Sequence, residues 1–270
     1  ESPEGYVVSA DENQAVIRSK GEAGLLNGVY GLLEHLGVGF YLSEEILPAP
    51  AKEFSFKGWQ LRNEPLIKDR YVFNWHNFLS GCTGWDEEHW LEWVGRSRKM
   101  GYNSIMVHAY FNNPMHTYSF NGVAKRNGYY ATSAIGRDWG CIPMNDIRRQ
   151  PGGEMFDGPV IGCKAAMGSE GQSVSSIQSM MKKVFAHAAD RGMGICFAFD
   201  ADMSLTFVQE DFIRQMPAAS KFMVQKGKTG VPNPDTAEGQ AYYTAQIKGL
   251  ITSYPMLTQI GCWVRGSSWF

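Results

Sequence analysis

Two carboxylates lie at the end of a buried apolar run in the second half of the chain. Asp200 and Asp202 follow residues 194–199, and residues two apart in an extended strand project to the same side. Hydrolysis of a glycosidic bond requires two carboxyl groups about 5–10 Å apart, one of them a general acid. Asp200 and Asp202 are therefore candidate catalytic residues. The alternative role for Asp200 is to cap the following helix.

Side chains suited to binding a sugar gather at the ends of several apolar runs. The CH face of a sugar ring packs on flat aromatic rings, and its hydroxyl groups pair with planar hydrogen-bonding groups. The candidates of this kind are Trp75, His76, Asn77, His108, Tyr110, Asn112, Asn113 and Trp269. Arg265 offers a rigid fork for a carboxylate, which a uronic-acid sugar would present, or for a salt bridge to Asp200.

A metal ion is the main alternative use of these groups. The ligands would come from His76, His108, His116, Asp200 and Asp202. However, the first run carries Trp-His-Asn in place of a His-x-His pair, and HExxH is absent. The sequence also has no GxSxG and no GxGxxG after a strand. We therefore expect neither a metal nor a cofactor.

The element that best positions such groups is residues 86–110. Apolar side chains recur every three or four positions from Trp90 to Met100, which predicts a helix with one buried face. Acidic residues at its start and basic residues at its end suit the helix dipole, and Gly101 provides a left-handed stop. Residues 104–108 then resemble a strand buried on both faces. Together they form one unit of an α/β barrel, whose active site lies at the carboxyl ends of the strands.

Similar units recur along the chain and predict a parallel sheet. Strands are expected at 70–78, 194–199 and 259–264, and helices at 173–191 and 237–254. Residues 57–65 are expected to lead into the first strand, and 111–171 form a long insertion. Four such units make about half of an eight-fold barrel. Because an open half-barrel leaves one edge uncovered, we expect a homodimer through that edge.

The first fifty residues have a different pattern. Strands are expected at 6–9, 15–18 and 38–42, around a helix at 21–36. The apolar face of this helix consists of Leu25, Val29, Leu32, Leu33 and Leu36. Its glycines, at positions 24, 28 and 31, each weaken an isolated helix by about 1 kcal/mol. We therefore expect them to serve close packing of the helix on the strands.

The segment VIRSKGEAGLLNGVYGLLEHLGVGFYL resembles the small α/β domain that precedes the catalytic barrel in glycoside hydrolase families 20 and 67. These families are the β-N-acetylhexosaminidases and the α-glucuronidases. The shared pattern is a hairpin strand, E-A-G-x-x-x-G-x-x-x-L, an aromatic strand and a proline, and it covers residues 5–50. The resemblance implies a small α/β sandwich domain at 1–52 and a partial (β/α) barrel of TIM type, incomplete in this chain, at 53–270.

The same resemblance implies hydrolysis of a uronic-acid or N-acetylhexosamine glycoside, polysaccharide degradation, and a secreted or periplasmic location. The sequence departs from the family pattern at the fourth barrel strand, where the general acid is expected. It has Trp263-Val-Arg265-Gly-Ser-Ser there, without a carboxylate. A non-catalytic carbohydrate-binding chain is therefore the second hypothesis.

Charge and hydropathy exclude other classes of partner. The 270 residues carry a net charge of -2 and no basic run, so we expect no nucleic-acid partner. No apolar stretch reaches membrane-spanning length, so we expect no membrane partner. The five cysteines form no CxxC pair, which disfavours a zinc ribbon.

Overall fold

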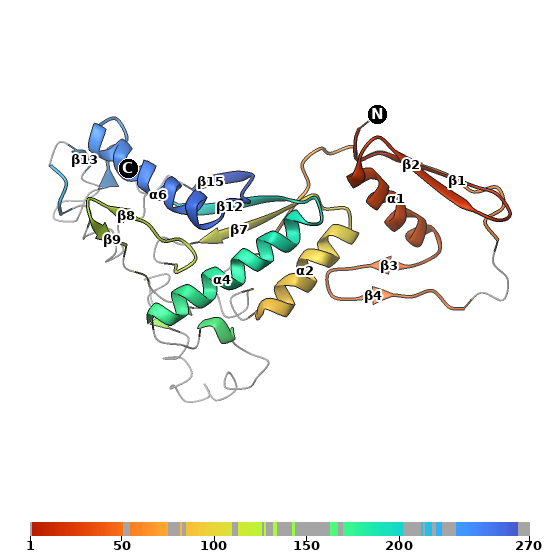
Figure 1. Cartoon of the computed structure of the whole chain (residues 1–270), viewed down its shortest axis with the longest axis horizontal. Helices are drawn as coiled ribbons and strands as arrows, with labels where there is room; N and C mark the ends of the chain where they lie inside the picture. Colours follow the sequence, from red (N-terminus) through yellow and green to blue (C-terminus); the bar gives the residue numbers. More distant parts are fainter. Residues whose placement is uncertain are drawn as a thin grey trace.

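A computed structural model defines the arrangement of the chain in two parts (Figure 1). It describes residues 2–50, 55–74, 82, 85–109, 113–125, 127, 132–133, 142–143, 163–166, 170–201, 212, 214–217, 220–222 and 231–263. Within these residues, no helix is both long enough and apolar enough to span a bilayer.

The N-terminal part is a three-stranded antiparallel sheet covered by one helix. Strands β1 (Tyr6–Ala10) and β2 (Ala15–Ser19) form the expected hairpin, and helix α1 (Glu22–His35) packs on it. The third strand is β5 (Gln60–Asn63), which pairs with β1 on the side away from β2.

Two expectations for this part need correction. Residues 57–65 do not lead into the second sheet, because β5 completes the first one. The strand expected at 38–42 is only β3 (Gly39–Phe40), which pairs with β4 (Glu45–Ile46) in a separate two-stranded ladder. The division of the chain at residue 52 stays a prediction, and the strand pairing favours a boundary after Asn63.

Helix α1 rests on the sheet through its glycines, as their spacing predicts. A Cβ on Gly28 would lie 2.4 Å from Cγ2 of Ile17, and a Cβ on Gly24 would lie 2.5 Å from the backbone oxygen of Gly5. The predicted apolar face is not the packed face, because Leu25 and Val29 are 44% and 42% exposed. Leucine and valine side chains on the sheet side would hold the helix too far from the strands.

Replacing Gly24 with alanine is expected to destabilise the protein by about 2 kcal/mol, although alanine favours a helix. The new methyl group would meet backbone oxygens that cannot move aside without shifting a strand. The matched control is Gly95→Ala in helix α2 (Glu87–Lys99), where a Cβ would meet nothing within 4 Å. That change should stabilise by up to about 1 kcal/mol. Urea unfolding measures both, and equal signs for the two variants would contradict the packing described.

The larger part contains the predicted parallel sheet. Its strands are β6 (Tyr71–Phe73), β7 (Ser104–Ala109), β12 (Gly194–Asp200) and β15 (Gln259–Trp263). All neighbours are parallel, in the order β15-β12-β7-β6, so the strands follow one another across the sheet as they do along the chain. Strand β6 ends earlier than the predicted strand at 70–78.

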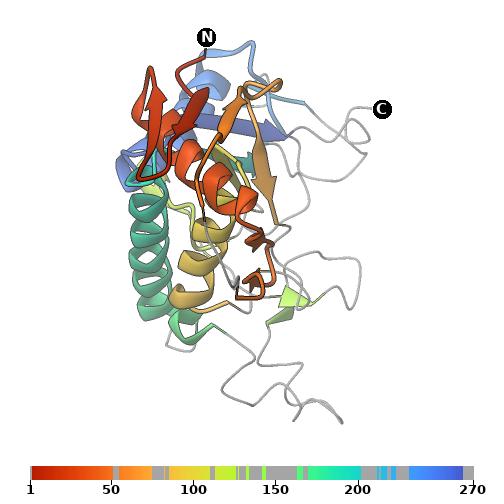
Figure 2. The same cartoon turned by 90° about the vertical axis from the view of Figure 1, so that its right-hand side faces the viewer.

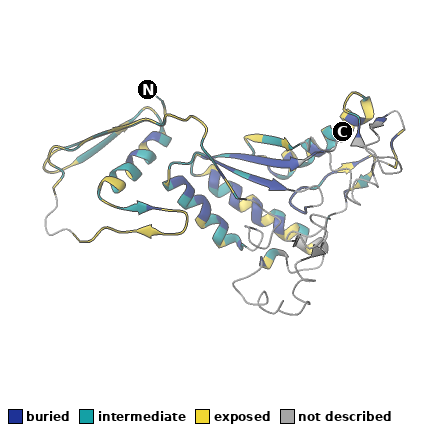
Figure 3. Ribbon diagram, turned by 180° about the vertical axis from the view of Figure 1, so that it is seen from behind, coloured by how far each residue is buried: buried dark blue, intermediate teal, exposed yellow. Residues whose placement is uncertain are grey.

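Helices α2, α4 (Glu170–Ala189) and α6 (Ala237–Ser253) accompany this sheet. Helices α2 and α4 lie side by side along it (Figures 1 and 2). The core between sheet and helices includes Ile105, Phe197 and Phe185, and the central strands are buried along their length (Figure 3).

The remaining described elements are short. They are β8 (Ser119–Phe120), β9 (Val123–Ala124), β10 (Thr132–Ser133), β11 (Ile142–Pro143), β13 (Lys221–Phe222), β14 (Val231–Pro232) and a 3-10 turn (Lys164–Ala166). The strands pair as three hairpin ladders, β8-β9, β10-β11 and β13-β14.

Helix α2 confirms most of the pattern read from its sequence. Its buried residues include Trp90 and Trp93, and Gly101 ends it with a φ of 86°. Met100 is 38% exposed, so its predicted place on the buried face is wrong. The buried face instead includes Arg98, which is 1% exposed.

Arg98 joins the two parts of the chain. Its guanidinium donates hydrogen bonds to Oδ1 of Asn27 (2.7 Å) and to the backbone oxygens of Ala23 and Arg191 (3.2 Å each). Asn27 and Ala23 belong to α1, and Arg191 follows α4. A basic residue that the sequence places at a helix end therefore links helix α1 to the larger part of the chain.

Candidate functional site

The carboxyl ends of the parallel strands lie level with one another. In the strand register, Ala109 of β7 is opposite Phe199 of β12, and Asp200 of β12 is opposite Trp263 of β15. Groups that follow β7, β12 and β15 in the sequence thus begin from the same edge of the sheet. This is the edge where the sequence predicted the site.

One face of the sheet carries polar and aromatic groups at this edge. His108 is opposite Ala198, and Ala198 is opposite Gly261, so these residues and Trp263, two beyond Gly261, share a face. Neighbouring residues such as Phe197 and Ile105 point to the opposite face, which packs on the helices. The aromatic face is therefore the one turned away from the helical layer.

Three rings meet on this face. The rings of His108 and Trp263 lie 4.4 Å apart between centroids with a 33° tilt, and the rings of Phe73 and Trp263 lie 6.2 Å apart at 70°. We call Phe73, His108 and Trp263 the strand-end rings. His108 is fully buried, whereas Phe73 is 37% exposed and Trp263 is partly exposed. Solvent therefore reaches Phe73 and Trp263, while His108 is enclosed and contacts Trp263.

Only some of the predicted site residues can be placed. His108 is at the expected edge, and the backbone of Asp200 lies beside that of Trp263. The side chain of Asp200 lies outside the described part of the structure. So do eight further predicted site residues, namely Trp75, His76, Asn77, Tyr110, Asn112, Asp202, Arg265 and Trp269. Their convergence with His108 stays a prediction. Phe73 and Trp263 were not selected from the sequence, although strand alternation from Gly261 indicates the face on which Trp263 lies.

Asn113 turns the chain after β7. Its side chain is buried, and Oδ1 accepts a hydrogen bond from the backbone N–H of Met115 (2.9 Å). Its backbone oxygen accepts a hydrogen bond from Nζ of Lys125 (2.8 Å). These contacts lie within the protein, so they shape the loop that follows β7. Contact between Asn113 and a sugar stays a prediction.

A buried polar network fastens the segment 113–125 to helix α6. Because a carbonyl only accepts, Nε2 of His116 donates to the backbone oxygen of Gln246 (3.0 Å). The hydroxyls of Tyr118 and Tyr242 are 3.0 Å apart, and Nε2 of Gln246 donates to the Tyr118 hydroxyl (3.2 Å). The sequence analysis did not identify this network. The only signal in the sequence is the four-residue spacing of Tyr242 and Gln246.

Burial suppresses positive charge in the network. Burial, with the neighbouring Lys125 as a smaller cause, lowers the pKa of His116 to about 3. Burial also holds the pKa of Lys125 well below its usual value. The Lys125 amine donates to the backbone oxygens of Asn113 and His116. His116, a candidate metal ligand from the sequence, thus has a role in holding the loop to α6.

The part of the chain that the structure describes contains no cluster of three or more His, Cys, Asp and Glu residues that could hold a metal ion. The described groups at the strand ends are instead flat rings, with the Asp200 backbone beside them. Such an arrangement can present a stacking surface to a ligand.

Comparison with known proteins gives similarities of fold to glycoside hydrolases. No protein-family model and no curated protein matches the sequence. A family 20 exo-β-N-acetylglucosaminidase from Vibrio harveyi is similar at 10% identity, over 94% of this chain and 35% of that chain, with a TM-score of 0.49. A second family 20 β-N-acetylglucosaminidase is similar at 13% identity, over 94% and 46%, with a TM-score of 0.48.

A GH138 enzyme targeting pectin rhamnogalacturonan II is also similar, at 11% identity over 95% of this chain and 24% of that chain, with a TM-score of 0.49. The present chain thus spans less than half the length of each of these three proteins.

Proposed function

We propose that this chain is part of a glycoside hydrolase and that its sugar site lies at the carboxyl edge of the sheet β15-β12-β7-β6. The observation that carries the proposal is the set of strand-end rings beside the Asp200 backbone. Parallel strands in consecutive order, with helices on one face, belong to the architecture in which active sites lie at this edge. We infer that the four strands are one half of a (β/α) barrel.

The proposed binding surface consists of the exposed faces of Phe73 and Trp263. Aromatic rings of this kind pack on the CH face of a sugar, and the enclosed His108 fixes the position of the Trp263 ring. The resemblance of the N-terminal segment to families 20 and 67 supports an N-acetylhexosamine or a uronic acid as the sugar. Arg265 would pair with the carboxylate of a uronic acid.

Asp200 and Asp202 are the proposed catalytic carboxylates. In either stereochemical course, one carboxyl group protonates the departing oxygen, and the other either attacks the sugar carbon or activates a water molecule. We expect Asp200→Asn or Asp202→Asn to lower turnover of uronate or N-acetylhexosaminide glycosides by about 100-fold or more, since a lost acid or base costs that much. Release of sugar from synthetic glycosides measures this loss.

The control is Asp190→Asn, which removes an exposed carboxylate at the end of α4 and should leave turnover unchanged. Unchanged turnover in both Asp200→Asn and Asp202→Asn would contradict the assignment of the carboxylates. Sugar binding without turnover in the wild type would favour the second candidate, a carbohydrate-binding chain. That candidate has its own support, because β15 is followed by Val264 and Arg265 where the related families place an acid.

A further inference from the structure

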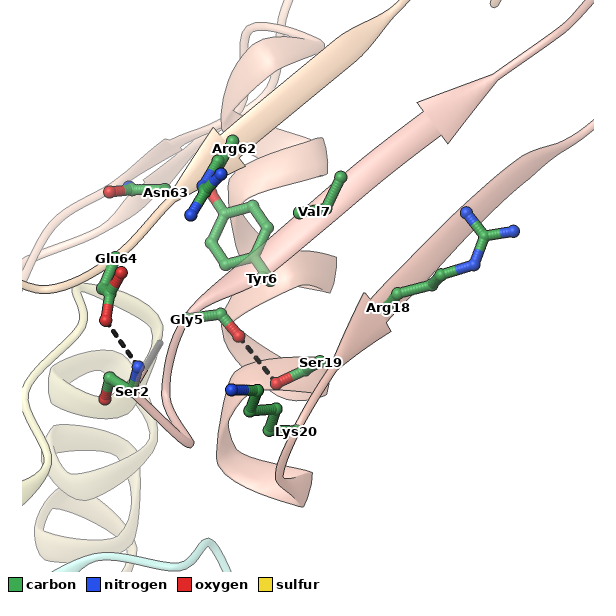
Figure 4. Close-up of a pocket in the computed structure, with 10 residues that line it drawn as sticks. All are labelled: Ser2, Gly5, Tyr6, Val7, Arg18, Ser19, Lys20, Arg62, Asn63 and Glu64. Carbon is green, nitrogen blue, oxygen red and sulfur yellow. Dashed lines mark hydrogen bonds between the residues drawn. The ribbon is translucent and has the colours of Figure 1, made fainter.

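A basic pocket lies at one end of the N-terminal sheet, and none of the strand-end rings lines it. The cavity has a volume of about 230 Å³ and forms where β1 begins and where β2 and β5 end (Figure 4). Its charged lining residues are Arg18, Lys20, Arg62 and Glu64. All four side chains are exposed.

The strand register places the two arginines on one face of the sheet. Arg18 of β2 and Arg62 of β5 are both opposite Val7 of the central strand. Directly paired residues share a face, so the three form one row across the sheet with an apolar centre. Adjacent strands are about 4.8 Å apart, so the two arginine backbones are separated by about 10 Å.

This row lies on the face that α1 does not cover. Tyr6 and Ser19 face the helix, because they are the groups that a Cβ on Gly28 or Gly24 would meet. Residues 7 and 18 alternate with them and must face the other way. Helix α1 therefore does not cover the basic row.

The charges of this part of the chain are segregated. Residues 1–63 contain nine Asp and Glu and only five Lys and Arg, yet three of those five basic residues line this one pocket. The one acidic lining residue of the pocket is Glu64, so the lining carries three positive charges against one negative charge. An acidic part of the protein therefore presents a local excess of positive charge on a flat sheet face.

We propose that the Arg18–Val7–Arg62 row and Lys20 bind the carboxylates of an acidic polysaccharide chain. This inference rests on the proposed function for the choice of a glycan as the anion. The planar forks of Arg18 and Arg62 suit carboxylates, which they can engage in paired hydrogen bonds. The surface would hold a long substrate chain on the N-terminal part while the strand-end rings engage one of its sugars.

The test is calorimetric titration of polygalacturonate, with neutral galactan as the comparison glycan. Wild type should bind polygalacturonate and not galactan, and binding should weaken with added salt. The double variant Arg18→Gln/Arg62→Gln should bind about tenfold or more weakly, since two charge-assisted contacts are lost. The control is Lys57→Gln, an exposed lysine of the same part outside the pocket, which should bind as wild type does.

Polygalacturonate binding that is equal in wild type and the double variant would overturn the proposal, as would no binding in wild type. Equal or tighter binding of dextran sulfate, which has no carboxylates, or of duplex DNA at the same site would overturn the assignment to carboxylates. Asp200→Asn separates this inference from the proposed function. If the double variant binds polygalacturonate weakly but no glycoside is hydrolysed, the binding surface is supported and the hydrolase activity is not. If turnover depends on Asp200 while the arginine substitutions leave binding unchanged, the hydrolase activity is supported and the binding surface is not.

Discussion

Lowering the pH from 6.5 to 4.5 is expected to reduce the free energy of unfolding by about 2 kcal/mol through His116 alone. The pKa of this buried histidine is about 3 in the folded protein, against an ordinary value of 6.5. Between these values the unfolded chain binds a proton and the folded chain does not. Stability is therefore lost as the pH falls through this window and is recovered as the pH rises.

The variant His116→Gln removes the titrating group but can keep the hydrogen bond to the Gln246 backbone oxygen. A glutamine amide can still donate to the Gln246 backbone oxygen but does not titrate, so the loss of stability between pH 6.5 and 4.5 should be smaller by about 2 kcal/mol. Urea unfolding at pH 6.5 and 4.5 measures the difference. The control is His89→Gln in the first turn of α2, where a glutamine side chain can still accept the hydrogen bond from the Asp86 backbone. This variant should lose as much stability between pH 6.5 and 4.5 as the wild type does. The same loss in His116→Gln as in wild type would refute the network.

Arg98→Met should cost about 3 kcal/mol of stability. The change leaves the backbone oxygens of Ala23 and Arg191 and the side-chain oxygen of Asn27 without their donor in a partly buried place. Each unsatisfied acceptor costs about 1–3 kcal/mol. Part of this loss is offset, because folding no longer has to remove the water around a charged guanidinium.

Lys183→Met on helix α4 is the control. Lys183 forms an exposed ion pair with Glu87 that lies within the larger part, and such pairs contribute less than about 1 kcal/mol. Thermal and urea unfolding of both variants make the comparison. An Arg98→Met protein as stable as Lys183→Met would show that Arg98 does not join the two parts.

The sequence predicted elements whose signals are local. Helix α2, the strand β7 and the left-handed stop at Gly101 follow from periodicity and from glycine geometry within about 25 residues. The parallel sheet followed from apolar runs without polar alternation.

Features that depend on distant partners could not be predicted in the same way. The face of α1 was misassigned because close packing on the sheet selects glycine over leucine, against the usual rule for amphipathic helices. Strand β5 carries no apolar pattern of its own and is recognised only by its pairing with β1. Arg98 lies in a helix end where a cation suits the dipole, so nothing local indicates its burial.

The same distinction between local signals and distant partners applies to the candidate site. The edge of the sheet and the place of His108 followed from the strand ends, because parallel strands bring equivalent ends together. The contact of His108 with Trp263 joins strands that are about 150 residues apart in sequence, and the network of His116 joins a loop to α6 over 130 residues. Such pairs have no common sequence signal when one chain is read alone.

The most direct test of the proposed site is an NMR titration of the protein with N-acetylglucosamine and with glucuronate. The indole signal of Trp263 and the ring signals of Phe73 should shift with one of the two sugars, and Trp263→Ala should abolish the binding. Signals from the sheet β2-β1-β5 should stay unchanged with N-acetylglucosamine, because this sugar has no carboxylate for the arginine row and is expected to bind at the strand-end rings. Saturable binding of either sugar that leaves Trp263 and Phe73 unperturbed would contradict the proposed site.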